Sequence, residues 1–136
     1  SGNFSLTDSY LSIHHALLHA GAELRTAIDI TWLDAKEFEY DHADFSVLDA
    51  CDGILIPGGF GVVGVEGKIN VIQYVRVHNI SYLGLCYGLQ LAVVEYARTI
   101  CGMKKAHTTE VDPDTPYPIV DILPMQKSYL DTHQYG

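Results

Sequence analysis

The sequence is poor in basic residues and in cysteine, and it has no long apolar run. The sequence has eight Lys and Arg residues and 17 Asp and Glu residues, which gives a formal net charge of −9. So few cations cannot form the basic patch that nucleic-acid binding requires, so we expect no nucleic-acid partner. No apolar run approaches the length of a membrane span, and the N-terminus has neither a basic region nor a signal-like apolar core. We therefore expect no membrane partner.

The three cysteines, Cys51, Cys86 and Cys101, form neither a C-x-x-C pair nor an even-numbered framework. This usage favours free thiols in a reducing compartment, so we expect the protein in the cytoplasm. There are seven histidines, but none pairs with a cysteine at zinc-ligand spacing. His14 and His15 are adjacent, so on a helix they point in different directions. We expect no metal site.

The 136 residues, 48% of them apolar, suffice for one domain with a real core. Short apolar runs alternate with helical periods along most of the chain, which predicts an α/β fold with a doubly wound, mostly parallel sheet and helices on both faces. The predicted elements are a helix capped by Thr7 or Asp8 and ended by Gly21, a strand at 26–33, a short helix at 44–50, a doubly buried strand at 54–56, a helix at 66–78, a strand at 82–85, a helix at 89–101 and a turn-rich surface loop at 112–118.

The most informative motif is the run GLCYG at 84–88. It follows an apolar run and precedes a helix, and glycines flank a nucleophile on such a turn because the backbones come too close for side chains. The first helical turn also directs unpaired N–H groups at the Cys86 sulfur, which favours thiolate over thiol. An ordinary buried cysteine in a strand-to-helix connection is the alternative.

A second glycine motif, PGGFG at 57–61, follows the apolar run at 53–56. The ends of parallel strands are where ligands bind in such folds, and both motifs fall at strand ends. One strand end carries a thiol and the other carries free backbone amides. These are the groups that acyl transfer from an amide needs.

The two motifs, together with several other segments, resemble the glutaminase domains of CTP synthases, which are class I glutamine amidotransferases. The resemblance runs from about residue 2 to about residue 127 and implies a flavodoxin-like fold. It rests on the segments DSYLSI at 8–13, IPGGFG at 56–61, GVEGK at 64–68, GLCYGLQLA at 84–92 and TEVDPDT at 109–115.

The resemblance implies a role for each matching site residue. Cys86 would be the nucleophile, and the backbone N–H groups of Gly59 and Tyr87 would form the oxyanion hole. Glu110 would receive the α-amino group of glutamine, although an exposed loop glutamate is the alternative. The rest of the glutamine-contacting turn would be Gly88, Leu89 and Gln90, and Gln90 could instead be an ordinary exposed helix residue.

The chain also departs from the family pattern. Val62 and Val63 stand where the family usually has arginine, which puts activation by GTP in doubt. The family places a His-x-Glu pair far downstream of the cysteine; His107 and His133 are weak substitutes for its histidine. We therefore expect residues 1–136 to be a partial amidotransferase domain without the first strand or the C-terminal half. Alone, this part should be poorly soluble and should not hydrolyse glutamine.

The function implied by the resemblance is hydrolysis of L-glutamine, with the ammonia passing to a synthetase domain of the same polypeptide that converts UTP to CTP. The glutaminase step would need no cofactor, whereas the synthetase domain would use ATP and magnesium, and the enzyme would be a homotetramer. Two alternatives remain from the residues themselves. One is a cysteine hydrolase or peptidase-like member of the same superfold, and the other is a non-catalytic module that binds glutamine.

Overall fold

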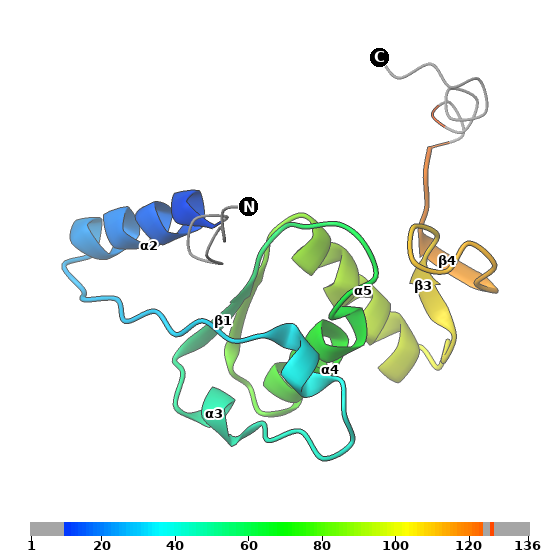
Figure 1. Cartoon of the computed structure of the whole chain (residues 1–136), viewed down its shortest axis with the longest axis horizontal. Coiled ribbons are helices and arrows are strands. Elements are labelled where there is room, and N and C mark those ends of the chain that lie inside the picture. Colours follow the sequence, from blue (N-terminus) through cyan, green and yellow to red (C-terminus); the bar gives the residue numbers. More distant parts are fainter. Residues whose placement is uncertain (1–9, 124–125, 127–136) are drawn as a thin grey trace, which may run out of the picture. The chain divides into compact units, whose positions relative to one another are not determined.

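A computed structural model of the chain describes residues 10–123 and residue 126 (Figure 1). The chain divides into two units, residues 1–33 and residues 34–136. The predicted cap at Thr7 or Asp8 and the weak candidate His133 lie outside the described residues.

The first unit contains one helix, α2 (Leu11–Glu23), among its described residues. The prediction that Gly21 ends this helix is wrong, because the helix continues for two more residues. Gly21 is instead buried where the chain folds back. A Cβ on Gly21 would lie 2.7 Å from the Thr26 carbonyl oxygen and 2.8 Å from Ile28 Cγ1, so only glycine fits there.

The strand predicted at 26–33 is also wrong. These residues follow α2 as an irregular segment, and all but Ile30 are exposed. The β-branched composition favours extended backbone, but a strand also needs a neighbour to accept and donate its hydrogen bonds. No such pairing occurs among the described residues. The segment makes a different contact, a stacked pair of the Tyr10 and Trp32 rings with centroids 5.9 Å apart.

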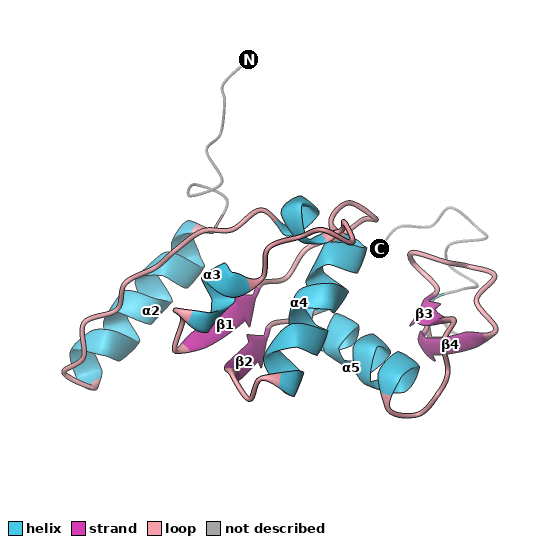
Figure 2. Ribbon diagram, turned by 90° about the horizontal axis from the view of Figure 1, so that it is seen from below, coloured by secondary structure: helices cyan, strands magenta, loops and turns pink. Residues whose placement is uncertain are grey.

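The second unit carries the remaining elements, and helices and strands alternate from α3 to β3 (Figure 2). They are the 3-10 helix η1 (Ala35–Phe38), α3 (Ser46–Asp49), β1 (Gly53–Ile56), α4 (Val65–Val77), β2 (Ser81–Gly84), α5 (Tyr87–Thr99), β3 (Ala106–Thr108) and β4 (Tyr117–Val120). The helices and strands predicted between residues 44 and 101 are confirmed, with each end within about two residues of its expected place.

Strands β1 and β2 are parallel neighbours, with Gly53 opposite Ser81 and Ile56 opposite Gly84. Because parallel strands end at the same edge, this register brings the loop after Ile56 beside the turn after Gly84. The prediction that residues 54–56 are buried on both faces is wrong. Ile56 is buried, but Ile54 and Leu55 are only half-buried, and β1 pairs only with β2 among the described residues.

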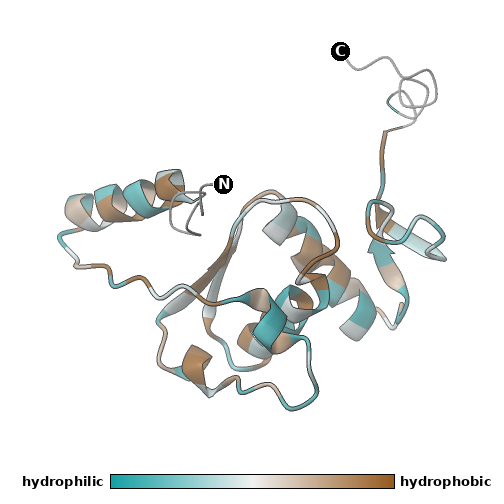
Figure 3. Cartoon of the chain, viewed as in Figure 1, coloured by the Kyte–Doolittle hydropathy of each residue, from teal (hydrophilic) through white to brown (hydrophobic). Residues whose placement is uncertain are grey.

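The core of this unit lies between α4, α5 and the β1–β2 pair. Apolar residues of α4 recur at helical spacing at Val65, Ile69, Ile72 and Val75, and all four are buried. Residues from η1, α3, β1 and α5 belong to the same cluster, and α3 and β1 stand out as apolar in Figure 3. No helix in the described part of the chain is both long and apolar enough to cross a lipid bilayer.

Strands β3 and β4 were not expected from the sequence. They form a second parallel pair, with Ala106 opposite Tyr117 and a register irregularity between His107 and Thr108. Pro118, which the sequence places in a surface loop, lies within β4. Within the described part of the chain β4 pairs with β3 alone, and proline is tolerated in such an edge strand because it cannot donate a ladder hydrogen bond. Of the loop predicted at 112–118, a turn is present at residues 113–114, whereas residues 117–118 belong to β4; a further turn at 109–111 was not predicted.

Candidate active site

Cys86 lies on the sharp turn that joins β2 to α5, immediately before the first helical residue Tyr87. Its backbone has φ 50° and ψ −104°, a conformation that L-residues other than glycine rarely adopt. The side chain is exposed. A strained, solvent-facing residue at a strand-to-helix turn is the geometry of a nucleophile elbow.

The two glycines that flank Cys86 are required by close contacts. A Cβ on Gly88 would collide with the carbonyl oxygen of Ile56, and one on Gly84 would lie 2.7 Å from the Gly88 carbonyl carbon. The turn is further held by a 2.9 Å hydrogen bond from the Leu85 N–H to the Ile56 carbonyl. The glycines at these positions therefore let β1, β2 and α5 meet directly beneath the cysteine.

Tyr82 is a supporting residue that the sequence analysis did not identify. Its hydroxyl donates a 2.8 Å hydrogen bond to the Gly88 carbonyl, across the elbow. Burial raises the pKa of the Tyr82 hydroxyl well above its ordinary value, so the group stays protonated as a donor. A tyrosine in an apolar strand carries no sequence signal for this contact, since only the fold brings Gly88 within reach.

The glycine loop after β1 lies against the elbow. A Cβ on Gly58 would be 3.4 Å from Cys86 Cβ and 4.0 Å from its sulfur, whereas one on Gly59 would meet nothing within 4 Å. Gly58 therefore packs against the side chain of Cys86, whereas the space beside Gly59 is open. The backbone N–H groups of Gly59 and Tyr87 donate to no acceptor within the described part of the chain. Both remain able to donate to a bound oxygen.

Glu110 follows β3 in the turn at 109–111 and is exposed. One of its carboxylate oxygens, Oε1, accepts a 3.1 Å hydrogen bond from the Gly61 N–H, 49 residues away in sequence. The fold therefore brings Glu110 to the same glycine loop that lies against Cys86. Glu110 is an exposed loop glutamate, as the alternative from the sequence has it, and its carboxylate also has a partner in the glycine loop.

Tyr87 contributes its side chain as well as its backbone. It is 1% exposed, and its hydroxyl donates a 2.8 Å hydrogen bond to the Gly61 carbonyl. The ammonium of Lys68 lies over the ring, 5.4 Å from its centroid. Burial, and secondly the negative charge of Glu110, raise the pKa of the Tyr87 hydroxyl. Neither Lys68 nor the Tyr87 hydroxyl was assigned a function from the sequence.

The remaining predicted residues lie on the first turn of α5. Gly88 is buried, Gln90 is half-buried, and the Gln90 N–H donates a 3.1 Å hydrogen bond to the Cys86 carbonyl. Leu89 is 58% exposed, a high value for an apolar side chain, so it forms part of the open surface around the cysteine. The structure thus brings together Cys86, the glycine loop, the start of α5 and Glu110.

His107, a weak candidate for the general base, is committed to another cluster. Its Nδ1 accepts a 2.9 Å hydrogen bond from the Thr108 N–H, so the neutral ring carries its proton on Nε2, which lies 3.5 Å from Glu66 Oε1. Arg98 donates to both Glu66 oxygens at 2.8 and 3.1 Å and to the Ala106 carbonyl. The sequence analysis explained the position of Glu66 at the start of α4 by the helix dipole alone and did not predict its contacts with Arg98 and His107.

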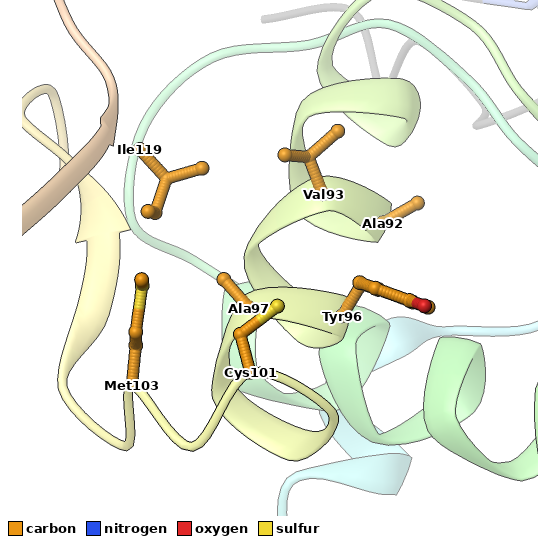
Figure 4. Close-up of a pocket in the computed structure, with 7 residues that line it drawn as sticks. All are labelled: Ala92, Val93, Tyr96, Ala97, Cys101, Met103 and Ile119. Carbon is orange, nitrogen blue, oxygen red and sulfur yellow. The ribbon is translucent and has the colours of Figure 1, made fainter.

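A separate apolar hollow of about 440 Å³ lies along α5 (Figure 4). Its lining comes from α5, the segment after it and β4: Ala92, Val93, Tyr96, Ala97, Cys101, Met103 and Ile119. The predicted site residues are not among them. No group of three metal-ligating side chains occurs among residues 10–123 and 126.

Comparison with known proteins identifies the family. The family model for class-I glutamine amidotransferases matches residues 5–132, nearly the whole chain. The chain belongs to the class I glutamine amidotransferases. The match extends past residue 127, where the sequence analysis placed the end of the resemblance.

The relatives of this amidotransferase chain are CTP synthases. It is 50% identical over 130 residues to the CTP synthase of Natronomonas pharaonis, 51% over 123 residues to that of Pyrococcus abyssi and 49% over 127 residues to that of Staphylococcus carnosus. These alignments cover 96%, 90% and 93% of the chain but only 23%, 22% and 23% of the relatives. The chain therefore spans about a quarter of their length.

A solved structure agrees with this assignment. The glutaminase domain of Trypanosoma brucei CTPS with bound acivicin matches with a TM-score of 0.84 and 34% identity. The match covers 92% of this amidotransferase chain and 48% of the other chain. The predicted α/β fold with parallel strand pairing is confirmed.

Proposed function

We propose that this chain supplies the nucleophile and the substrate grip for glutamine hydrolysis in a CTP synthase. The observation that carries the proposal is the conformation of Cys86, an exposed thiol on a strained turn at the start of α5. The relatives and the structural match support the reaction class.

In the proposed reaction, the Cys86 sulfur attacks the side-chain carboxamide carbon of glutamine, and the carbonyl oxygen takes up the negative charge. The N–H groups of Gly59 and Tyr87 would stabilise that oxygen, and one such donor is worth on the order of 3 kcal/mol in the transition state. The C–N bond then breaks and ammonia leaves with an added proton. Water hydrolyses the remaining thioester to glutamate and regenerates the thiolate.

Glu110 would hold the substrate's α-ammonium group. Its Oε1 accepts from Gly61, and a carboxylate can accept further hydrogen bonds on its second oxygen. Gly88, Leu89 and Gln90 would complete the surface that contacts glutamine. Proton transfer requires a general base, and the resemblance assigns this role to a His-x-Glu pair, a pattern that does not occur within these 136 residues.

We further propose that the ammonia serves a synthetase domain that converts UTP to CTP with ATP and magnesium. The glutaminase step itself would use no cofactor. The parent enzyme would be cytoplasmic and a homotetramer, with residues 1–136 forming part of its amidotransferase domain. These proposals rest on the relatives, of which the chain spans about a quarter.

The test uses the full-length protein and replaces Cys86 with serine. We expect Cys86→Ser to abolish CTP formation from glutamine and to leave CTP formation from free ammonia intact, because only the ammonia-generating step needs the thiolate. Cys51→Ser and Cys101→Ser are matched controls that should keep both activities. Glutamine-dependent activity that survives in Cys86→Ser would refute the assignment.

A second measurement separates the two alternatives. A chloroketone analogue of glutamine should label Cys86 stoichiometrically, and glutamine should protect against the labelling. Labelling that glutamine does not slow would favour a cysteine hydrolase of the same superfold. Absence of labelling would favour a non-catalytic binding module.

A further inference from the structure

Both polar groups of the Gly61 peptide are held by side chains of the candidate site. The Tyr87 hydroxyl donates to the Gly61 carbonyl at 2.8 Å, and the Gly61 N–H donates to Glu110 Oε1 at 3.1 Å. These partners are separated from Gly61 by 26 and 49 residues of sequence. We propose that Tyr87 is a positioning residue for glutamine hydrolysis, which acts with Glu110 to clamp the glycine loop beside Cys86.

The loop has little side-chain packing of its own around Gly61. Phe60 is 90% exposed, and Val62 and Val63 are 61% and 63% exposed. Gly61 has φ +85°, and a Cβ there would meet nothing within 4 Å. A glycine-rich segment with exposed side chains gains little order from apolar burial, so hydrogen bonds to fixed partners determine where its backbone lies.

Tyr87 is a suitable fixed partner. Its ring is 1% exposed within the core, and the Lys68 ammonium lies over it. Desolvation lowers the pKa of Lys68, whereas the face of the Tyr87 ring favours the charged ammonium. This attraction between ammonium and ring helps to hold both side chains in place. The raised pKa of the Tyr87 hydroxyl keeps it a donor, and the Gly61 carbonyl is a suitable acceptor.

The clamp links three parts of the proposed reaction. The Tyr87 backbone would be one oxyanion donor, and the Tyr87 hydroxyl orients the loop that carries the other donor, Gly59. Glu110, the proposed ammonium anchor, holds the same loop through one oxygen and keeps the second for the substrate. The inference rests on the proposed function, since it concerns the placing of groups in that reaction.

The test compares Tyr87→Phe with Tyr74→Phe in the full-length protein. Each variant removes one hydroxyl that donates a 2.8 Å hydrogen bond, from Tyr87 to Gly61 and from Tyr74 of α4 to Asp49 of α3. We expect Tyr87→Phe to lower kcat/KM for glutamine by about 10-fold and Tyr74→Phe to leave it unchanged. The ammonia-dependent activity should stay at the wild-type level in both.

The outcomes separate the inference from the proposed function. An active wild type whose kinetic constants for glutamine are the same in Tyr87→Phe would overturn the role of Tyr87 alone. A wild type that releases no ammonia from glutamine would overturn the proposed function and the clamp's part in it.

Hydrogen exchange tests the clamp without turnover. Amide exchange at residues 58–63 should speed up in Tyr87→Phe and in Glu110→Ala, because each breaks one side of the clamp. It should stay slow in Glu110→Gln, whose amide oxygen can still accept from Gly61. Equal exchange in all variants would show that other contacts fix the loop, and would overturn the proposal.

Discussion

The carboxylate of Glu110 accepts a hydrogen bond and carries a negative charge, and a substitution can remove the charge while it keeps the acceptor. Glu110→Gln keeps an oxygen for the Gly61 N–H but removes the charge that an ammonium group requires. We expect the KM for glutamine to rise by about 10-fold or more in the full-length enzyme, with ammonia-dependent CTP synthesis unchanged.

Glu37 offers a matched control for that substitution, since it is an exposed glutamate of η1. Glu37→Gln removes the same charge outside the site and should leave the KM unchanged. If Glu110→Gln also has the wild-type KM, Glu110 does not hold the substrate and its role is limited to the glycine loop.

For single residues, the sequence predicts the nucleophile Cys86 better than it predicts the side chains that support the turn around it. Glycines on both sides of Cys86 indicate a turn with no room for a Cβ, and the contacts at Gly84 and Gly88 agree with that reading. The hydroxyls of Tyr82 and Tyr87 have no such signal. Each bonds a backbone carbonyl whose position depends on the packing of β1, β2 and α5, so only the folded chain reveals them.

Helices α4 and α5 are joined by an ion pair in which Glu95 is buried and Arg76 is partly exposed. Arg76 donates to both oxygens of Glu95 at 2.7 and 2.9 Å, and Glu95 is 1% exposed. The hydrogen bonds to Glu95, and less so its negative charge, hold the pKa of Arg76 above its ordinary value. Arg76→Met would leave the carboxylate buried without its partner, so we expect the free energy of unfolding to fall by about 3 kcal/mol.

Urea denaturation checks this prediction, with Lys104→Met as the control at an exposed position. The control should change stability by less than about 0.5 kcal/mol. Adding Glu95→Met to Arg76→Met should restore part of the loss, because paired apolar side chains can replace a buried ion pair. A loss below about 1 kcal/mol in Arg76→Met would show that Glu95 finds another partner or stays hydrated.

Element prediction succeeded where periodicity and burial agree, as in α4 and α5. It failed in two opposite ways elsewhere. The β-branched segment at 26–33 has the composition of a strand but no pairing partner in the described structure. In contrast, β3 and β4 pair although each is only three or four residues long and β4 contains a proline. His107 and Thr108 are buried by their partner strand and by α5, and three residues are too few for a recognisable period.

Across the second unit as a whole, one polar cluster makes stability depend on pH. Burial, and secondly the charge of Arg98, lower the pKa of His107 below its ordinary value of 6.5, while Glu66 and Asp112 oppose this in part. The folded state therefore favours neutral His107 more than the unfolded state does. Its contribution to stability is complete above pH 6.5 and is lost as the pH falls from there towards the lowered value.

We expect the melting temperature to fall between about pH 7 and about pH 5.5 in the wild type. His107→Asn should flatten this part of the profile, because asparagine does not titrate. The exposed residue His42 provides the control, since His42→Asn should keep the wild-type slope. The same slope in wild type and His107→Asn would assign the pH dependence to other groups.

The two proposed oxyanion donors are main-chain N–H groups, so side-chain mutagenesis cannot remove them. Except for proline, every amino acid substituted at residue 59 or 87 still has a backbone N–H group. Substitution therefore reports on sterics and side-chain contacts, such as the hydroxyl of Tyr87. Replacing the amide itself with an ester, by protein semisynthesis, would remove the donor and leave every side chain intact. It follows that a relative with another residue type at either position, proline excepted, still carries the backbone donor.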